Sequence, residues 1–300
     1  MPKPSNRISP RLYVITAVVS LGLSVVASGA SFAIQVTPSP LNLDAFEGYE
    51  NWPMLMPDTD RFNRGEFPDL RIRYDAQFPG PEGLGGPLVD TEMVLDVING
   101  NFRSTPTLMI QWTSTGQSDG GLSSGSIDHL VVDRATNRLL HRIQAQPPAF
   151  GDFQWTGAYR IIGFQPDSIA NMLVSERGEI QLTGLDDVSP DTIDFATLQF
   201  WLPFIELEAG MHFRVPVYRY PLNELDGLPV YVSGREIVLD AHGEDHDVWN
   251  VQVMSIGGGA LTEFWITEDA PYFLGWDYRL AATGQRVTRM RYQSHWTFDQ

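Results

Sequence analysis

Apolar and polar side chains alternate with a period of two residues near the end of the chain, at residues 286–298 and 272–280. Such alternation is typical of β-strands that bury one face and expose the other. Residues 281–285 lie between the two segments and include Gly284, so the pattern predicts a hairpin. One face is predicted to carry Thr288, Met290, Tyr292, Ser294, Trp296 and Phe298 on the last strand, and Tyr272, Leu274, Trp276, Tyr278 and Leu280 on the strand before it.

Short segments of the same kind recur along the chain, separated by turn-forming residues. Because the connections between them are short, the pattern predicts an antiparallel sheet; parallel strands would need longer crossovers. Residues 34–68 contain several prolines and are predicted to be irregular, and residues 69–300 are predicted to form a single, mainly all-β domain. The other predicted strands are 71–78, 93–98, 107–113, 127–133, 138–146, 153–164, 172–175, 179–182, 212–219, 229–239, 248–256 and 261–266.

One segment, residues 191–205, has a helical period instead. Asp191 is predicted to cap its start, with Asp194 supporting the cap, and Pro203 to end or kink it. Phe195, Leu198, Leu202 and Ile205 fall on one helical stripe. We therefore expect an amphipathic helix that covers an open face of the sheet.

The first 33 residues have the order of a secretory signal peptide. Lys3, Arg7 and Arg11 precede an apolar run over residues 12–26, and small residues follow. Cleavage after Ala30 or Ala33 is expected, which predicts a periplasmic or secreted protein; the alternative is an uncleaved membrane anchor.

The net charge of −17 limits the classes of partner. Removal of residues 1–33 would make it −20, since that segment carries three basic and no acidic residues. Such a surface repels nucleic acid and anionic headgroups, so neither is an expected partner. The chain has no cysteine, which excludes disulfide and thiolate chemistry.

Two sequence features could indicate a hydrolase, and neither predicts a catalytic residue. Residues 121–125 match the G-x-S-x-G pattern, but the helix that should follow such a serine is not predicted. Asp58, Asp60 and Glu66 lie near Trp52, as acids and aromatic residues do in glycosidase clefts, yet a solvated loop has the same composition.

The densest polar cluster spans residues 240–247. Asp240, His242 and His246 are weak candidates for metal ligands, since imidazoles and carboxylates bind divalent ions such as zinc. The spacing is that of neither a helical zinc site nor a calcium loop, and a hairpin tip is the simpler interpretation. No cofactor is expected.

Four segments resemble a group of bacterial periplasmic proteins, mostly of unknown function, that are similar to the lipoprotein-localisation-factor superfamily. They are residues 127–134, residues 193–203, residues 232–236 with 248–253, and residues 263–266 with 270–272. The resemblance covers roughly residues 90–300. It implies a strongly curved antiparallel sheet, or half-barrel, with one or two helices in or across its concave face. It also implies a non-enzymatic protein that holds an acyl chain or another apolar ligand, and no catalytic residue can be carried over.

We therefore expect an exported protein that binds or carries a lipid-like ligand on its concave face. The alternatives are an envelope accessory protein that binds a protein partner, and a secreted hydrolase that uses the acidic or histidine-rich loops. The same apolar residues could also form a closed core. The predicted ligand-binding residues are Phe195, Leu198, Trp201, Leu202, Tyr272, Leu274, Trp276, Met290, Tyr292 and Trp296.

Overall fold

The computed structural model describes residues 41–56, 67–79, 88–115, 127–145, 159–164, 168–174, 179–187, 192–218, 227–255 and 258–298. The chain divides into two compact units, Met1–Thr37 and Pro38–Gln300, and every described residue belongs to the second. The predicted signal peptide lies outside the described residues. Among the residues described, no helix is both long and apolar enough to cross a membrane.

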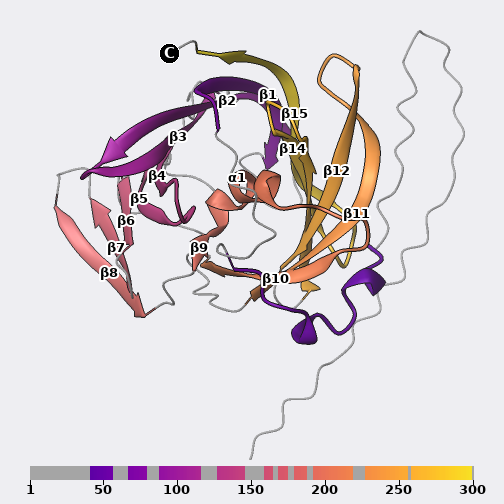
Figure 1. Ribbon diagram of the computed structural model, residues 1–300, viewed down its shortest axis with the longest axis horizontal. Helices are drawn as coiled ribbons and strands as arrows, with labels where there is room; N and C mark the ends of the chain where they lie inside the picture. The colour runs from indigo at the N-terminus through magenta and orange to yellow at the C-terminus, as the bar shows by residue number, and fades with distance from the viewer. Residues whose placement is uncertain are drawn as a thin grey trace, which may run out of the picture. The chain divides into compact units, whose positions relative to one another are not determined.

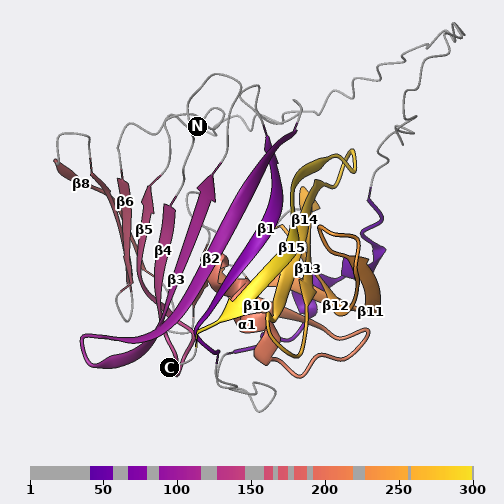
Figure 2. The same cartoon turned by 90° about the horizontal axis from the view of Figure 1, so that it is seen from above.

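The second unit is built on one curled sheet, which wraps around a short helical segment (Figures 1 and 2). Neighbouring strands pair antiparallel in the order β8-β7-β6-β5-β4-β3-β2-β1-β15-β14-β13-β12-β11-β10-β9, with a parallel pair only between β9 and β10 among the described strands. This confirms the predicted class, an all-β curved antiparallel sheet with helices on its concave side. The strands are β1 (Leu70–Pro79), β2 (Leu88–Phe102), β3 (Thr105–Thr115), β4 (Ile127–Asp133), β5 (Leu139–Ala145), β6 (Tyr159–Phe164), β7 (Ser168–Val174), β8 (Ile180–Asp187), β9 (Ile193–Asp194), β10 (His212–Tyr218), β11 (Gly227–Leu239), β12 (Asp245–Met254), β13 (Ala260–Ile266), β14 (Phe273–Leu280) and β15 (Arg286–Thr297).

The inner face of the sheet carries the main hydrophobic core. On β1, Leu70, Ile72, Tyr74 and Ala76 are buried, while the residues between them point outward. Because side chains alternate along a strand, the apolar half of each pattern meets in one cluster on the concave side. The core joins strands from both ends of the sheet, from Ile169 on β7 to Val217 on β10.

The helical segment is shorter than the sequence predicts. It consists of the 3-10 turn η3 (Phe195–Thr197), the helix α1 (Leu198–Trp201) and the 3-10 turn η4 (Leu202–Phe204). Asp191 lies outside the described residues; the cap is Asp194, whose Oδ1 accepts a hydrogen bond from the Ala196 N–H at 2.7 Å. The prediction of a helix from residue 191 was wrong because Ile193 and Asp194 extend as β9 and pair with Val217 and Tyr218.

The burial of this segment also differs from the prediction of a single apolar stripe. All four residues of α1 are buried, including Gln199, and Trp201 and Leu202 have no exposed surface. A helix that is buried on all sides lies inside a core. Figure 1 shows α1 within the curve of the sheet, with strands on both sides.

The two ends of the sheet meet through side chains. Arg142 on β5 lies 3.0 Å from Asp194 on β9, and the Asn171 side chain on β7 donates to the Tyr218 hydroxyl on β10 at 2.9 Å. These contacts join strands that lie far apart in the sheet order. The curled sheet is therefore held closed by polar side-chain bonds across its interior.

Two β-bulges change which residues face inward on the last strands. The pairing of β13 with β14 passes from Trp265 opposite Gly275 to Ile266 opposite Phe273, so Leu274 has no opposite residue. Phe273 therefore packs in the main core, while Leu274 packs in a separate cluster with Trp265 and Val248.

The second bulge lies in β15. Its pairing with β1 passes from Tyr74 opposite Tyr292 to Arg73 opposite Ser294, which leaves Gln293 without an opposite residue. Beyond it Trp296 lies opposite Arg71 on the outer face, where it is 46% exposed and the Arg73 guanidinium lies 5.2 Å from its ring centroid. The predicted single face of β15 is thus wrong from Gln293 onward.

The described part of the irregular N-terminal segment contains two 3-10 turns, η1 (Asp44–Phe46) and η2 (Tyr49–Asn51). After them, the backbone of residues 53–55 runs beside β10: the Leu55 N–H donates to the Arg214 carbonyl, and the Arg214 N–H donates to the Pro53 carbonyl, both at 2.8 Å. Phe46 and Trp52 form a small cluster of their own with Met254 and Leu261.

Candidate functional site

A cavity of about 360 Å³ lies on the inner side of the sheet, against the start of the helical segment. Its walls come from the strands in the middle of the sheet order, from β5 through β1 and β15 to β13, and from η3 and α1. Most of the lining residues keep part of their surface exposed, so solvent reaches the cavity. The lining residues are Phe78, Met93, Trp112, Asp128, Arg142, Gln144, Phe195, Ala196, Gln199, Thr262, Phe264, Trp276, Tyr278 and Thr288.

The polar end of the cavity is formed by β4 and β5. Asp128 lies opposite Gln144, and Leu130 lies opposite Arg142, so these side chains share the inner face. Leu130 packs into the core, whereas Asp128, Arg142 and Gln144 reach the cavity. The sheet thus places charged groups on a face that is otherwise apolar.

Arg142 is bound by two carboxylates. Its Nε donates to Asp128 Oδ1 at 2.8 Å, its second terminal nitrogen contacts Asp128 Oδ2, and its first donates to Asp194 Oδ1 at 3.0 Å. Gln144 Nε2 also donates to Asp128 Oδ2 at 3.4 Å. One guanidinium therefore faces two carboxylates, and the group carries one excess negative charge when all three are ionised.

Burial and charge act in opposite directions on this group. Burial disfavours the charged guanidinium, but Asp194 and Asp128 more than offset this, so the pKa of Arg142 is raised. Burial raises the pKa of Asp194, although Arg142 and the Ala196 N–H favour its ionised form. Asp128 raises the pKa of Asp194 further, because the two negative charges repel each other.

Aromatic side chains make up much of the remaining wall. The ring centroids of Trp112 and Trp276 are 6.1 Å apart, and those of Phe264 and Trp276 are 6.3 Å apart with an edge-on geometry. The Trp276 indole N–H donates to Thr288 Oγ1 at 3.2 Å, which fixes the orientation of this ring. The site combines a hydrophobic wall with a polar end, as is typical of small-molecule sites.

The structure places two of the ten predicted ligand-binding residues, Phe195 and Trp276, at the cavity. Leu198, Trp201, Leu202 and Met290 have no exposed surface and belong to the core. The first three lie in the buried middle of the helical segment, and Met290 lies on the inner face of β15.

The other four predicted residues lie away from the cavity. Tyr272 packs on Phe67, with ring centroids 4.8 Å apart. The bulges explain the positions of Leu274, in its separate cluster, and of Trp296, on the outer face. Tyr292 is partly buried, and its hydroxyl lies 2.8 Å from His295 Nδ1.

Asp128, Arg142 and Asp194 were not predicted from the sequence to be site residues. Asp128 lies at alternate positions with the apolar residues Leu130 and Val132 and therefore points to the same face of β4 as they do. A charged residue on an otherwise apolar face could have indicated a site residue. Arg142 is harder to assign to the inner face from the sequence. A bulge between the pairs Val131–His141 and Val132–Leu139 changes which residues of β5 point inward.

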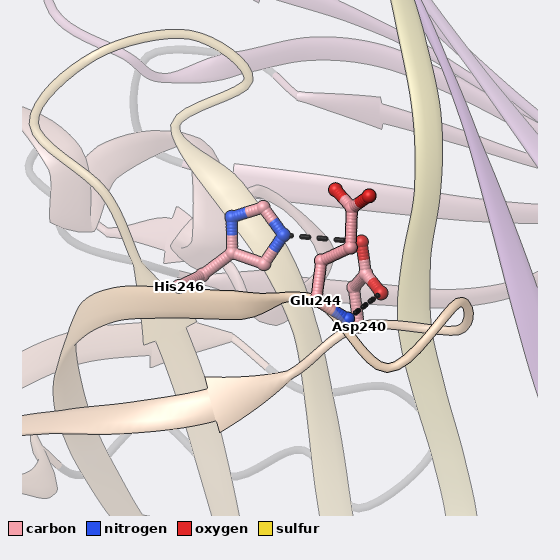
Figure 3. Close-up of side chains that lie close together, drawn as sticks. All are labelled: Asp240, Glu244 and His246. Carbon is pink, nitrogen blue, oxygen red and sulfur yellow. Dashed lines mark hydrogen bonds and ion pairs between the residues drawn. The ribbon is translucent and has the colours of Figure 1, made fainter.

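A second polar group, Asp240, Glu244 and His246, lies at the hairpin between β11 and β12 (Figure 3). Their possible ligand atoms lie within 4.8 Å of one another, and His246 Nε2 is 3.1 Å from Asp240 Oδ2. The other oxygen of Asp240 accepts hydrogen bonds from the N–H groups of His242 (2.8 Å) and Glu244 (2.9 Å). Asp240 therefore closes the hairpin, as the turn interpretation predicts.

Of the predicted metal candidates, the structure brings Asp240 and His246 together, adds Glu244, and leaves His242 exposed in the turn. The N–H groups of Glu244 and His242 and the His246 side chain outweigh the effect of burial and lower the pKa of Asp240. The G-x-S-x-G segment at residues 121–125, and Asp58, Asp60 and Glu66, lie outside the described residues.

Comparison with known proteins gives no activity. Residues 157–279 match the model of a family described as a protein of unknown function, DUF3108. None of the curated proteins matches. A beta-barrel-like protein of the domain of unknown function DUF1849 from Brucella abortus is similar in structure, with a TM-score of 0.49 and 12% sequence identity over 78% of this chain and 99% of that one. The chain is thus similar, over part of its sequence, to proteins of unknown function.

Proposed function

We propose that this protein is an exported, non-enzymatic binding protein that holds an apolar, lipid-like ligand inside the curled sheet. The observation that carries the proposal is the aromatic cavity of about 360 Å³ between the sheet and the helical segment. Its volume lies within the range of small-molecule sites, and its wall can bury an alkyl chain. The resemblance to the lipoprotein-localisation-factor superfamily is consistent with this proposal.

Export is the second part of the proposal, and it rests on the amino-terminal sequence. The basic, apolar and small-residue regions follow one another in the order of a secretory signal. Amino-terminal sequencing of protein recovered from the periplasm is expected to begin at Ser31 or Ile34. A chain that begins at residue 1 and stays with the membrane fraction would contradict the proposed cleavage and export.

A cavity-filling variant tests the binding. N-phenyl-1-naphthylamine fluoresces in apolar sites, so we expect a saturable rise in its fluorescence with the wild-type protein. Ala196 lines the cavity, and Ala196→Phe places a ring there; we expect at least about tenfold weaker binding, as for a site that loses about 1.4 kcal/mol. Thr288→Phe is a second filling variant.

Ala282→Phe is the matched control, because Ala282 is exposed in the hairpin loop between β14 and β15. It adds the same ring to the surface and should leave binding unchanged. If both filling variants fold and bind the probe as tightly as the control, the ligand does not occupy this cavity.

A further inference from the structure

We propose that the cavity selects amphiphiles with a cationic headgroup, of the alkylammonium class, over amphiphiles with a carboxylate. This inference rests on the proposed function, since it concerns which ligand the same cavity takes. It follows from two features of the lining, the charge at the polar end and the aromatic wall.

Arg142 looks at first like a receptor for an anionic headgroup, and its contacts argue against that role. Asp128 binds its Nε and one terminal nitrogen, and Asp194 binds the other terminal nitrogen. A carboxylate ligand would have to displace one of these partners, and it would bring a third negative charge to one guanidinium. In a cavity of low polarity, such like-charge contact costs far more than it does in water.

Asp128 is the group that can receive a cation. Its side chain lines the cavity and is 18% exposed, while Asp194 is covered, with 2% of its side chain exposed. Asp128 accepts bonds from Arg142 and Gln144, and a carboxylate has about four acceptor positions, so part of its negative charge still faces the cavity and can contact an ammonium group. The excess negative charge of the group is therefore available from inside the cavity.

The aromatic wall favours the same sign of charge. Ring faces carry partial negative charge and attract ammonium groups. Trp112 and Trp276, with ring centroids 6.1 Å apart, are the largest of these rings. The aromatic lining residues are Phe78, Trp112, Phe195, Phe264, Trp276 and Tyr278.

The test compares three probes with the same decyl chain on the full mature protein: decyltrimethylammonium, decanoate and decanol. Displacement of N-phenyl-1-naphthylamine by each probe is measured at low and at high salt, below the micelle concentration of the two ionic probes and below the solubility limit of decanol. We expect decyltrimethylammonium to bind at least about tenfold more tightly than decanoate at both salt concentrations. Salt screens the net charge of the exposed surface much more than a contact inside the cavity, which separates the two effects.

Variants then test which residues cause the preference for a cationic headgroup. Asp128→Asn leaves Arg142 paired with Asp194 and should reduce the ratio of cation to anion affinity at least about fivefold, while Asp128→Glu should keep it. Gln144→Glu adds a negative charge at the cavity and should increase the ratio. Glu47→Gln is the control, since it removes one charge from an exposed site in η1's C-cap and should leave the ratio unchanged.

The possible failures can be told apart. If decanoate binds as tightly as decyltrimethylammonium, or if Asp128→Asn and Gln144→Glu leave the ratio as Glu47→Gln does, the headgroup inference is wrong and the cavity still binds apolar chains. If none of the three probes displaces the dye, the proposed function fails, and the headgroup inference fails with it.

Discussion

Arg142 on β5 and Asp194 on β9 form an ion pair of 3.0 Å between strands that lie far apart in the sheet order. Asp194 also begins the helical segment, because its Oδ1 accepts the Ala196 N–H. One carboxylate thus caps the buried turns and ties them to the opposite part of the sheet. The same pair stands at the polar end of the cavity, so the closure of the fold and the charge of the site depend on shared residues.

We expect Arg142→Met to lower the free energy of unfolding by about 3–5 kcal/mol, because it leaves Asp194 buried without its cation. Urea unfolding at neutral pH measures this change. Arg71→Met is the control: Arg71 pairs with Asp96 at 2.6 Å but is 46% exposed, and loss of an exposed pair costs about 1 kcal/mol or less. Equal losses in the two variants would show that the buried pair does not hold the sheet closed.

Gly275→Ala is expected to be strongly destabilising. Gly275 has φ +137°, and a Cβ built there would lie 2.0 Å from the Met290 carbonyl oxygen on β15. We expect a loss of at least about 2 kcal/mol from the strained backbone and the forced separation of β14 and β15. Gly163→Ala on β6, where a Cβ meets no atom within 4 Å, should cost less; thermal unfolding of both variants checks the difference.

Asp277 on the outer face should make stability depend on acid pH. Burial opposes its ionisation, but bonds from Arg286 (2.7 Å) and Arg279 (2.8 Å) outweigh it and lower its pKa below 3.8. Its stabilising effect is therefore complete above pH 3.8 and is lost as the pH falls through the lower, folded-state pKa. Asp277→Asn should cost about 1–3 kcal/mol at pH 7, because the two arginines that it leaves behind are about one third exposed, and progressively less under acid conditions. Urea unfolding across this pH range would contradict the account if the cost of the variant did not change.

The contribution of Asp194 to stability should change with pH in the opposite direction. Its pKa is raised above 3.8 by burial, so the folded state binds a proton more readily than the unfolded state. Its contribution is therefore most favourable at low pH and is lost as the pH rises from 3.8 through the folded-state pKa. NMR titration of the Asp194 carboxyl carbon measures that pKa directly, and a value below 3.8 would contradict this prediction.

Asp240→Ala is expected to loosen the hairpin between β11 and β12. The variant removes the acceptor for the N–H groups of His242 and Glu244, which should exchange with solvent faster. We expect a loss of about 1–2 kcal/mol, since these hydrogen bonds close a turn near the surface. Hydrogen exchange followed by NMR tests this; unchanged exchange at both amides would show that the carboxylate does not organise the turn.

The sequence was most informative where local pattern decides the structure. The two-residue period of β14 and β15, and Gly284 at φ +67° in the loop between them, are local features, and the hairpin forms as expected. The turn at Asp240 could also be predicted from the sequence, because turn-forming residues lie between two segments in which apolar and polar residues alternate.

The cavity could not be assigned in the same way. Single-residue bulges at Leu274 and Gln293 reverse the inward face, and no pattern of apolar residues marks them. Arg142 and Asp194 are 52 residues apart and meet only because the sheet curls. The predicted start of the helix was wrong for a related reason, since β9 pairs with β10 and takes the residues that would have formed the first turn.

The proposal that an apolar chain occupies the cavity lined by Trp112 and Trp276 is tested most directly by a crystal structure with 10-bromodecanol. This probe is uncharged, so the result does not depend on headgroup preference. We predict an anomalous bromine peak within the cavity, in contact with its aromatic lining. Bromine bound only outside this cavity, at a probe concentration that displaces N-phenyl-1-naphthylamine, would contradict the account.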